Sequence, residues 1–352
     1  SASAQAKAAA DAKAAEAAKA EASRKTAKKA EPKAITEGGF SVRISASACE
    51  WQRQCAEKLS EAEKTTAAYV ADTSVEAKKH RRTLDKEVTK YVVQISAVKE
   101  QIMAKASDIV QMVKSKCADD VQRTFVLQTL ATKLMKQCEV QVAMSNEFAF
   151  ALAEVAVHIM AAFPMFEGIL MGTLHKACIL AVPKYYIYKS GGGSDDDYFR
   201  KMGYKETPEE ERQQKGRWES TDDFLFRSLG FIYLYAAIVQ VDVAQHPHGL
   251  ERGWEYLARL LNSLPSNRTT STALHAFLKV CGYKMYHIYG KQFMKLLEYV
   301  QEFFLPDLNK STDPDARAVH SRLHLFIDGR EYMKSPVGRE IPQVDESKDY
   351  HD

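Results

Sequence analysis

Residues 51–112 contain neither proline nor glycine, and this uninterrupted stretch most restricts how the chain can fold. Its apolar residues recur every three or four positions, as Val88, Val92, Ile95 and Ile102 illustrate. That spacing places them on one face of a helix, whereas a half-buried strand would alternate apolar and polar residues. We therefore predict one or two long amphipathic helices here.

The rest of the chain also has helical periodicity. Residues 121–178 are rich in apolar side chains and divide into three shorter helices, the third of which starts at Pro164. Helical repeats return after residue 221 and continue to about residue 327, and no useful length of strand pattern occurs. Successive helices that are each apolar on one face predict an all-α, HEAT-like stack of helical hairpins.

Composition suggests three divisions of the chain. Residues 1–39 are mostly Ala, Lys and Glu, which predicts a solvated helix or linker at the end of an upstream coiled coil. Residues 40–336 are expected to form the folded domain, with an excursion at 179–221 that contains tyrosines, a glycine run and acidic residues. Residues 337–352 are expected to form a loose acidic tail.

The net charge of +3 with 27% charged residues does not resemble a general nucleic-acid coat, so an anionic partner would have to bind a local patch. The six cysteines form no C-x-x-C pair, which argues against zinc and favours free thiols in a reducing compartment. No apolar run approaches the ~20 residues that span a bilayer. These features predict a soluble nuclear or cytoplasmic protein.

The sequence offers no recognisable catalytic centre. It lacks the phosphate-binding loop, the dinucleotide fingerprint, the nucleophile elbow and the H-E-x-x-H zinc motif, so we predict a binding protein and no enzyme. The segment His246-Pro247-His248 has no third ligand nearby, and we interpret it as a rigid helix entry whose histidines cap or pack.

Three groups of cations stand out. Lys79 and Arg82 share a helix face with Lys86 and Lys90, and Arg81 lies beside that face. Lys133 and Lys136 are three residues apart on a later helix, and Lys176 ends another. A solvated helix face explains the first group alone. If the three helices converge, however, the cations would form a pocket for a compact polyanion with several phosphates.

Several unusual segments resemble the Gle-one family of mRNA export factors. They include residues 246–262, the runs Leu174-His175-Lys176-Ala177-Cys178 and Lys133-Leu134-Met135-Lys136-Gln137, and residues 198–204 and 230–239. The matches keep their order from about residue 80 to residue 305.

This resemblance implies a fold similar to HEAT-like and MIF4G scaffold domains. It implies a non-enzymatic adaptor that binds inositol hexakisphosphate and contacts a DEAD-box ATP-dependent RNA helicase, favouring the open state that releases RNA. It also implies binding to the C-terminal segment of an FG-repeat nucleoporin, with locations at the cytoplasmic side of the nuclear pore complex, in the cytoplasm and in the nucleus.

Carried over by position, the polyphosphate ligands implied by the resemblance are Arg81, Lys133 or Lys136, and Lys176, with Arg82 and Lys79 as neighbours. The sequence departs from the family pattern at Ala177 and Ile179, where a second lysine and a proline are usual. Thr173 stands where one fungal relative has arginine. These departures reduce the expected number of cations.

The family implies nucleoporin contacts in the second half of the chain, for which Trp254, Tyr256, Phe277 and Tyr283 are candidates, although aromatic residues are more often part of the core. The alternative function is an RNA-binding HEAT-like scaffold of translation or RNA processing. It would require a longer basic track with interleaved aromatic residues, and only Tyr91 lies close to the basic cluster. No direct sequence-specific binding of nucleic acid is expected.

Overall fold

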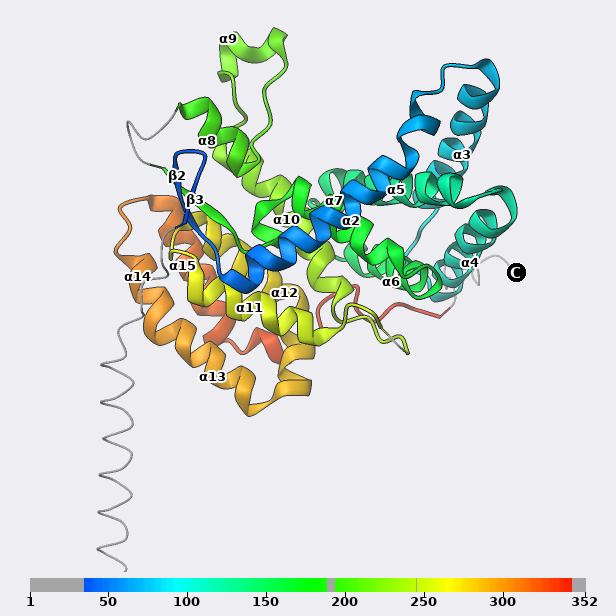
Figure 1. The fold of residues 1–352 in the computed structure, drawn as a ribbon. Helices are drawn as coiled ribbons and strands as arrows, with labels where there is room; N and C mark the ends of the chain where they lie inside the picture. Colours follow the sequence, from blue (N-terminus) through cyan, green and yellow to red (C-terminus); the bar gives the residue numbers. More distant parts are fainter. Residues whose placement is uncertain (1–34, 189–193, 245, 344–352) are drawn as a thin grey trace, which may run out of the picture. The chain divides into compact units, whose positions relative to one another are not determined.

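Helices make up most of the computed structural model, which describes residues 35–188, 194–244 and 246–343 (Figure 1). This confirms the predicted all-α class. The helices are α2 (Ala46–Ala71), α3 (Val75–Val93), α4 (Lys99–Lys116), α5 (Asp120–Gln137), α6 (Phe148–Ala162), α7 (Met165–Ala177), α8 (Asp195–Met202), α9 (Arg212–Lys215), α10 (Thr221–Ile238), α11 (Leu250–Ser263), α12 (Arg268–Tyr289), α13 (Lys291–Tyr299), α14 (Leu305–Asn309) and α15 (Pro314–Asp328). The predicted helix or linker in residues 1–34, the glycine run and the end of the tail lie outside the described residues.

The long polar segment forms three helices, α2, α3 and α4, so the prediction of one or two was wrong. The first break needs no proline or glycine because polar side chains begin a new helix there. Asp72 accepts a hydrogen bond from the Ser74 backbone N–H at 2.8 Å, and the Ser74 hydroxyl accepts one from the Ala77 N–H at 3.3 Å. A serine at this position satisfies one of the N–H groups that a helix start leaves free.

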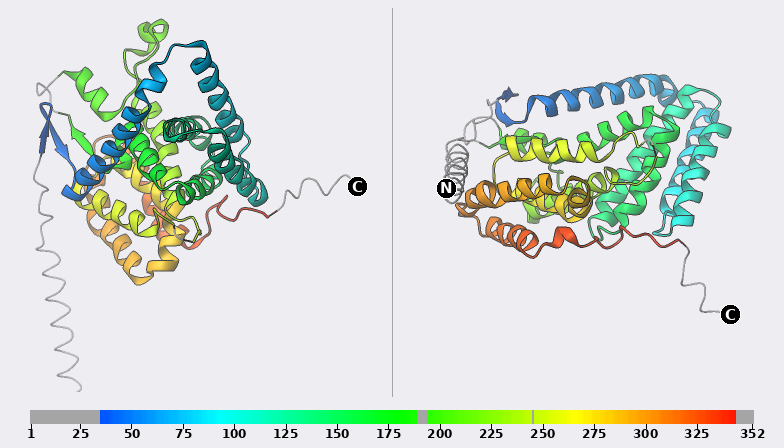
Figure 2. Two further views of the ribbon diagram at one scale, coloured as in Figure 1. Left: turned by 45° about the vertical axis from the view of Figure 1, so that its right-hand side comes forward. Right: turned by 90° about the horizontal axis from the view of Figure 1, so that it is seen from below.

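The core is centred on α10, which packs against both α6 and α12. Phe231, Leu234 and Ala237 of α10 are completely buried. Figure 2 shows α10 and α12 within the stack and α2 along its edge. Helix α10 therefore joins the first half of the described domain to the second through apolar contacts.

A small antiparallel sheet adds to the helices. Its strands are β1 (Ile35–Glu37), β2 (Phe40–Arg43) and β3 (Tyr185–Ile187), in the order β1-β2-β3. Gly38 and Gly39 form the two-residue turn with φ of 56° and 84°, a backbone conformation that glycine adopts at little cost. The domain therefore begins before residue 40, and residues 35–37 are a strand where a helix or linker was predicted.

The sheet is fixed to the excursion by a half-buried polar cluster. Lys184 Nζ lies 2.7 Å from a carboxylate oxygen of Glu37, and the Tyr186 hydroxyl donates to the other oxygen at 2.8 Å. This contact ties β1 to the segment that follows α7.

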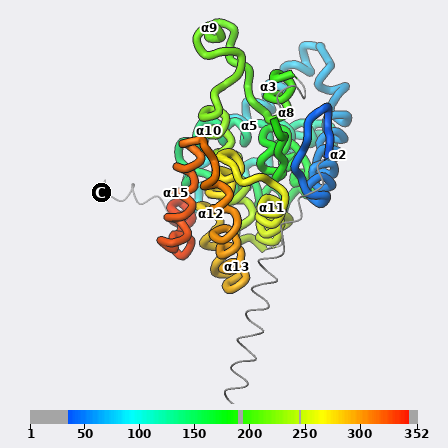
Figure 3. The backbone as a smooth tube through the Cα atoms, turned by 90° about the vertical axis from the view of Figure 1, so that its left-hand side faces the viewer, coloured from blue at the N-terminus to red at the C-terminus, as the bar shows by residue number. Residues whose placement is uncertain are grey.

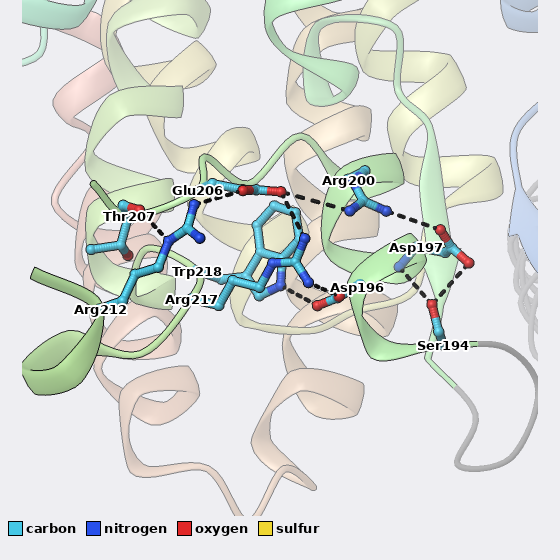
Figure 4. A network of polar contacts seen from close by, with 9 residues as sticks. All are labelled: Ser194, Asp196, Asp197, Arg200, Glu206, Thr207, Arg212, Arg217 and Trp218. Atoms are coloured by element: carbon cyan, nitrogen blue, oxygen red, sulfur yellow. Dashed lines mark hydrogen bonds and ion pairs between the residues drawn. The ribbon is translucent and has the colours of Figure 1, made fainter. Parts of the chain in front are cut away.

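The excursion itself is held by a polar network, shown in Figure 4. The Trp218 indole N–H donates to Asp196 at 2.8 Å, and Arg217 pairs with the same carboxylate and with Glu206 at 3.1 Å. Arg212 also pairs with Glu206, at 2.9 Å. The hairpin that carries α9 projects from the helical stack in Figures 1 and 3, and these contacts fix its base.

The described part of the tail is not loose. The N–H groups of Lys99 and Glu100 donate to the carbonyl oxygens of Pro342 and Gln343, at 2.8 and 3.3 Å. Val98 precedes α4 and offers no side-chain cap, so the tail satisfies N–H groups that would otherwise be free. The prediction of a loose tail is wrong for residues 337–343.

Candidate anion-binding groove

Three helices line an open groove of 690 Å³ on the first half of the domain. Helices α2 and α5 pack together and form most of its walls, and α3 contributes Asp85. Thr66 of α2 is buried on the groove side and donates a hydrogen bond to the Gln128 side chain at 2.9 Å. This bond sets the relative position of the two walls. The lining residues are Glu63, Thr66, Ala67, Val70, Ala71, Asp85, Phe125, Gln128, Thr129, Thr132, Lys133 and Lys136.

Helix α5 places two lysines in the groove. Asp119 caps the helix by accepting a hydrogen bond from the Gln122 N–H at 2.8 Å. The core residues Leu127, Leu130 and Leu134 are completely buried on the opposite face. Because Lys133 and Lys136 are three residues apart, they project toward the same side of α5, and both line the groove as predicted for a shared patch.

Helix α7 brings Lys176 close to Glu63, which lines the groove. A Cβ atom at Gly172 would lie 2.7 Å from the Cys55 carbonyl oxygen, so glycine allows α7 and α2 to pack closely. Lys176 is four residues after Gly172 and thus points toward α2. Its Nζ lies 3.5 Å from Glu63, which lines the groove. The structure therefore places Lys133 and Lys136 in the groove lining, and Lys176, which is not a lining residue, reaches the groove only through its ion pair with Glu63.

The Arg81 side chain, predicted to bind the polyphosphate, contacts the backbone of α2. Its guanidinium donates to the backbone carbonyls of Tyr69 and Asp72, the latter at 2.7 Å, and lies over the Tyr69 ring at 5.5 Å. It thereby satisfies carbonyl groups that the C-terminus of α2 leaves free. Arg81 lies one turn before Asp85 on α3, but its guanidinium is directed at the end of α2.

Lys79 and Arg82 are exposed on α3 and do not line the groove. Both point into solvent next to the wall that carries Asp85, so they can reach an anion only if it extends beyond the groove. The predicted set of cations is thus divided between a groove group and an exposed group on α3.

Carboxylates neutralise much of the groove. Asp85 Oδ1 lies 3.0 Å from Lys133 Nζ, and Glu63 pairs with Lys176. Two acidic side chains therefore balance two of the three lysines even without a bound anion. Sequence reasoning missed Asp85 and Glu63 because each is far in sequence from the lysine with which it pairs. Only the packing of the helices brings the partners together.

The four aromatic candidates in the second half differ in exposure. Tyr256 and Phe277 belong to the core, with exposed fractions of 1% and 0%, and their rings stack at 4.7 Å. Their prediction as partner contacts is wrong because they have no accessible surface. Trp254 and Tyr283 are partly exposed, and Trp254 packs on Tyr289 at 4.8 Å, so these two stay as predictions.

The histidine segment packs as we interpreted it. His246 Nε2 bonds the Ile238 carbonyl at 2.7 Å, and its Nδ1 accepts from the His248 N–H at 3.0 Å. Within the part of the chain that the structure describes, no three potential metal ligands come together, and none of the helices there is long and apolar enough to cross a membrane.

Comparison with known proteins gives the family. The model of a family described as GLE1-like protein matches residues 54–301, which cover the groove and most of the second half. The chain belongs to the GLE1-like family. It is 30% identical over 308 residues to the mRNA export factor GLE1 of Arabidopsis thaliana, an alignment covering 86% of this chain and 44% of the relative. The identity to the mRNA export factor GLE1 of Mus musculus is 37% over 224 residues, covering 62% of the chain and 30% of the relative.

The chain therefore spans less than half the length of these GLE1 relatives. Its fold resembles a solved structure of the S. cerevisiae Dbp5 C-terminal domain bound to Gle1 and IP6, with a TM-score of 0.71 and 17% identity. That similarity covers 85% of this chain and 98% of the solved one. It supports the helical architecture predicted for a GLE1-like protein.

Proposed function

We propose that this chain is the helical part of an mRNA export factor that binds a DEAD-box RNA helicase and stimulates it. Inositol hexakisphosphate would bridge the two proteins from the groove. The observation that carries the proposal is the open groove that Lys133 and Lys136 of α5 line, with Lys176 of α7 paired to the lining residue Glu63. Family membership supports it, as does the similarity in fold to Gle1 structures that were solved as complexes with Dbp5 and IP6.

The groove residues fit a phosphorylated ligand. Lys133 and Lys136 both line the groove, Lys136 is exposed, and Lys176 pairs with the lining residue Glu63. Each charge-assisted contact contributes about 1.5–3 kcal/mol before desolvation is subtracted. Arg82 and Lys79 would meet only those phosphates that extend along α3, and the role first assigned to Arg81 is weakened by its bonds to α2. The ligand supplies negative charge on several sides, so it can join these cations to those of a partner.

Stimulation of the helicase requires differential binding. The adaptor must bind the open arrangement of the helicase more tightly than the closed, RNA-bound one, because equal affinity for both would shift nothing. Anchoring to the C-terminal segment of an FG-repeat nucleoporin would place this reaction at the cytoplasmic side of the nuclear pore. Trp254 and Tyr283 are the remaining candidates for that contact.

Calorimetry with inositol hexakisphosphate tests the proposal. Lys133→Glu, Lys136→Glu and Lys176→Glu should each weaken binding by roughly tenfold or more, because each replaces an attraction by a repulsion. Lys310→Glu is the matched control, since Lys310 is an exposed lysine that directly follows α14 and does not line the groove. Unchanged affinity in all three groove variants would show that the assignment is wrong.

A second experiment measures function directly. The chain should raise the ATPase rate of a DEAD-box helicase such as Dbp5 in the presence of the polyphosphate, and Lys136→Glu should reduce that rise. A gel shift with single-stranded RNA alone separates this proposal from an RNA-binding scaffold, which would show tight binding that weakens steeply with salt.

A further inference from the structure

Two carboxylates lie inside the proposed anion site. Asp85 holds Lys133 with both oxygens, at 3.0 and 3.2 Å, and Glu63 pairs with Lys176 at 3.5 Å. Both acids line the groove itself. An anion site that contains acidic side chains opposes its own ligand, and this arrangement requires an explanation.

Folding stability does not explain why the two carboxylates are present. The side chains of Asp85 and Glu63 are 44% and 53% exposed, and those of their partners Lys133 and Lys176 are 27% and 75% exposed. Ion pairs at such positions contribute little to folding because water screens them and ordering long side chains costs entropy. The effect of these carboxylates must therefore fall mainly on what binds to the lysines.

We propose that Asp85 and Glu63 are internal counter-anions that lower the affinity of the groove for polyphosphate. This inference rests on the proposed function. A phosphate oxygen at about 2.8 Å from Lys133 Nζ cannot be more than about 6 Å from the nearer Asp85 oxygen, given the 3.0 Å ion pair. The ligand must either accept this repulsion or displace the carboxylate, and both lower its affinity.

The consequence is that the adaptor alone holds the ligand weakly. The charged residues that line the groove are Lys133, Lys136, Asp85 and Glu63, whose formal charges cancel. Lys176, which pairs with Glu63 from outside the lining, adds one positive charge. Firm retention then depends on cations that the bound partner adds. The carboxylates thus make polyphosphate binding conditional on assembly of the complex.

The expected change is measurable. Removing one like charge at this distance should raise affinity roughly three- to tenfold, since the interaction lies between fully and partly screened limits. The gain should be larger for inositol hexakisphosphate than for an inositol trisphosphate, because repulsion grows with ligand charge. It should shrink as salt is raised.

The test is calorimetric titration of Asp85→Asn, Glu63→Gln and the double variant with both inositol phosphates, at two salt concentrations. Glu87→Gln and Glu57→Gln are matched controls on α3 and α2. Glu87 pairs with Lys116 and Glu57 with Arg53, and neither acid lines the groove. Melting curves for each variant verify that the fold is retained.

The outcomes separate the two proposals. Tighter binding in the groove variants but not in the controls supports the counter-anion role, as does binding that appears only in the double variant. If the unaltered chain binds inositol hexakisphosphate and the groove variants bind it equally or more weakly, the counter-anion role is overturned and the proposed function stands. If no form of the chain binds it, both are overturned.

Discussion

The Nδ1 atom of His248 lies 2.9 Å from a carboxylate oxygen of Glu167, and this buried pair joins α7 to the segment before α11. The His248 ring is completely buried and stacks on Trp51 of α2 at 5.8 Å. Burial alone would raise the pKa of Glu167, but the hydrogen bond from His248 and the charges of Lys58 and Arg252 hold that pKa below its usual range.

Glu167→Ala should therefore destabilise the domain by about 1–3 kcal/mol, because it leaves a buried imidazole without its acceptor. Urea unfolding followed by circular dichroism measures the change. Glu57→Ala, at an exposed site on α2, should have little effect. A loss for Glu167→Ala no greater than in this control would contradict the structural role of the pair.

His175 makes the domain sensitive to acid. Burial lowers the pKa of His175 to about 3, with smaller contributions from His248 and Arg259. The folded state keeps the ring neutral while the unfolded chain binds a proton near pH 6.5. The contribution of His175 to the free energy of unfolding is therefore complete above pH 6.5 and decreases as the pH falls toward 3. At pH 5 the loss is about 2 kcal/mol.

His175→Gln should remove this contribution of about 2 kcal/mol, whereas His275, whose pKa burial lowers to about 4, keeps its own share of the pH dependence. Within the described residues neither ring nitrogen has a hydrogen-bond partner, so the substitution breaks no such bond. The measurement is the difference in unfolding free energy between pH 7 and pH 5, with exposed His287→Gln as the control. An unchanged difference would show that His175 does not cause the acid sensitivity.

Gly172→Ala should separate α7 from α2. The added methyl group would lie 2.7 Å from the Cys55 carbonyl oxygen and 2.8 Å from the Leu59 Cβ, and backbone cannot move aside cheaply. We expect a loss of about 1–3 kcal/mol from this overpacking, together with weaker polyphosphate binding because Lys176 shifts. Met165→Ala, at a half-exposed position of α7, should change neither property.

A chain that ends at Pro336 should have a less stable α4. Its first N–H groups would lose the carbonyls of Pro342 and Gln343, so hydrogen exchange at Lys99 and Glu100 should accelerate. Val98→Asp in the shortened chain should recover about 0.5–2 kcal/mol by providing a side-chain cap. Slow exchange at these amides in the shortened chain without the cap would contradict this role of the tail.

Helical periodicity was sufficient to predict the class and most helices. It failed at the boundary between α2 and α3 because Ser74 starts a helix through a local hydrogen bond that the apolar pattern does not register. The sheet was missed because its strands have three or four residues, too short for alternation to be visible. The tail was missed because its bonds to α4 link residues far apart in sequence.

The candidate groove was only partly predictable. Lys133 and Lys136 share a face by spacing alone, whereas Lys176 was nominated by its place at a helix end and by the family resemblance. The same reasoning could not show that Arg81 binds the carbonyls of α2. The sequence does not give the direction of a side chain, so every arginine in a basic run is a candidate anion ligand. Nor could it exclude Tyr256, whose helix is amphipathic and whose burial depends on the partner helix α12.

Helix α2 is secured at both extremities. The β1–β2 hairpin, whose Glu37 pairs with Lys184, comes immediately before the helix. At its other end the Arg81 guanidinium donates hydrogen bonds to backbone carbonyls. Its 26 residues extend for roughly 39 Å, at 1.5 Å per residue. One continuous helix therefore connects the contact with α3 at its C-terminus to the small sheet at its N-terminus.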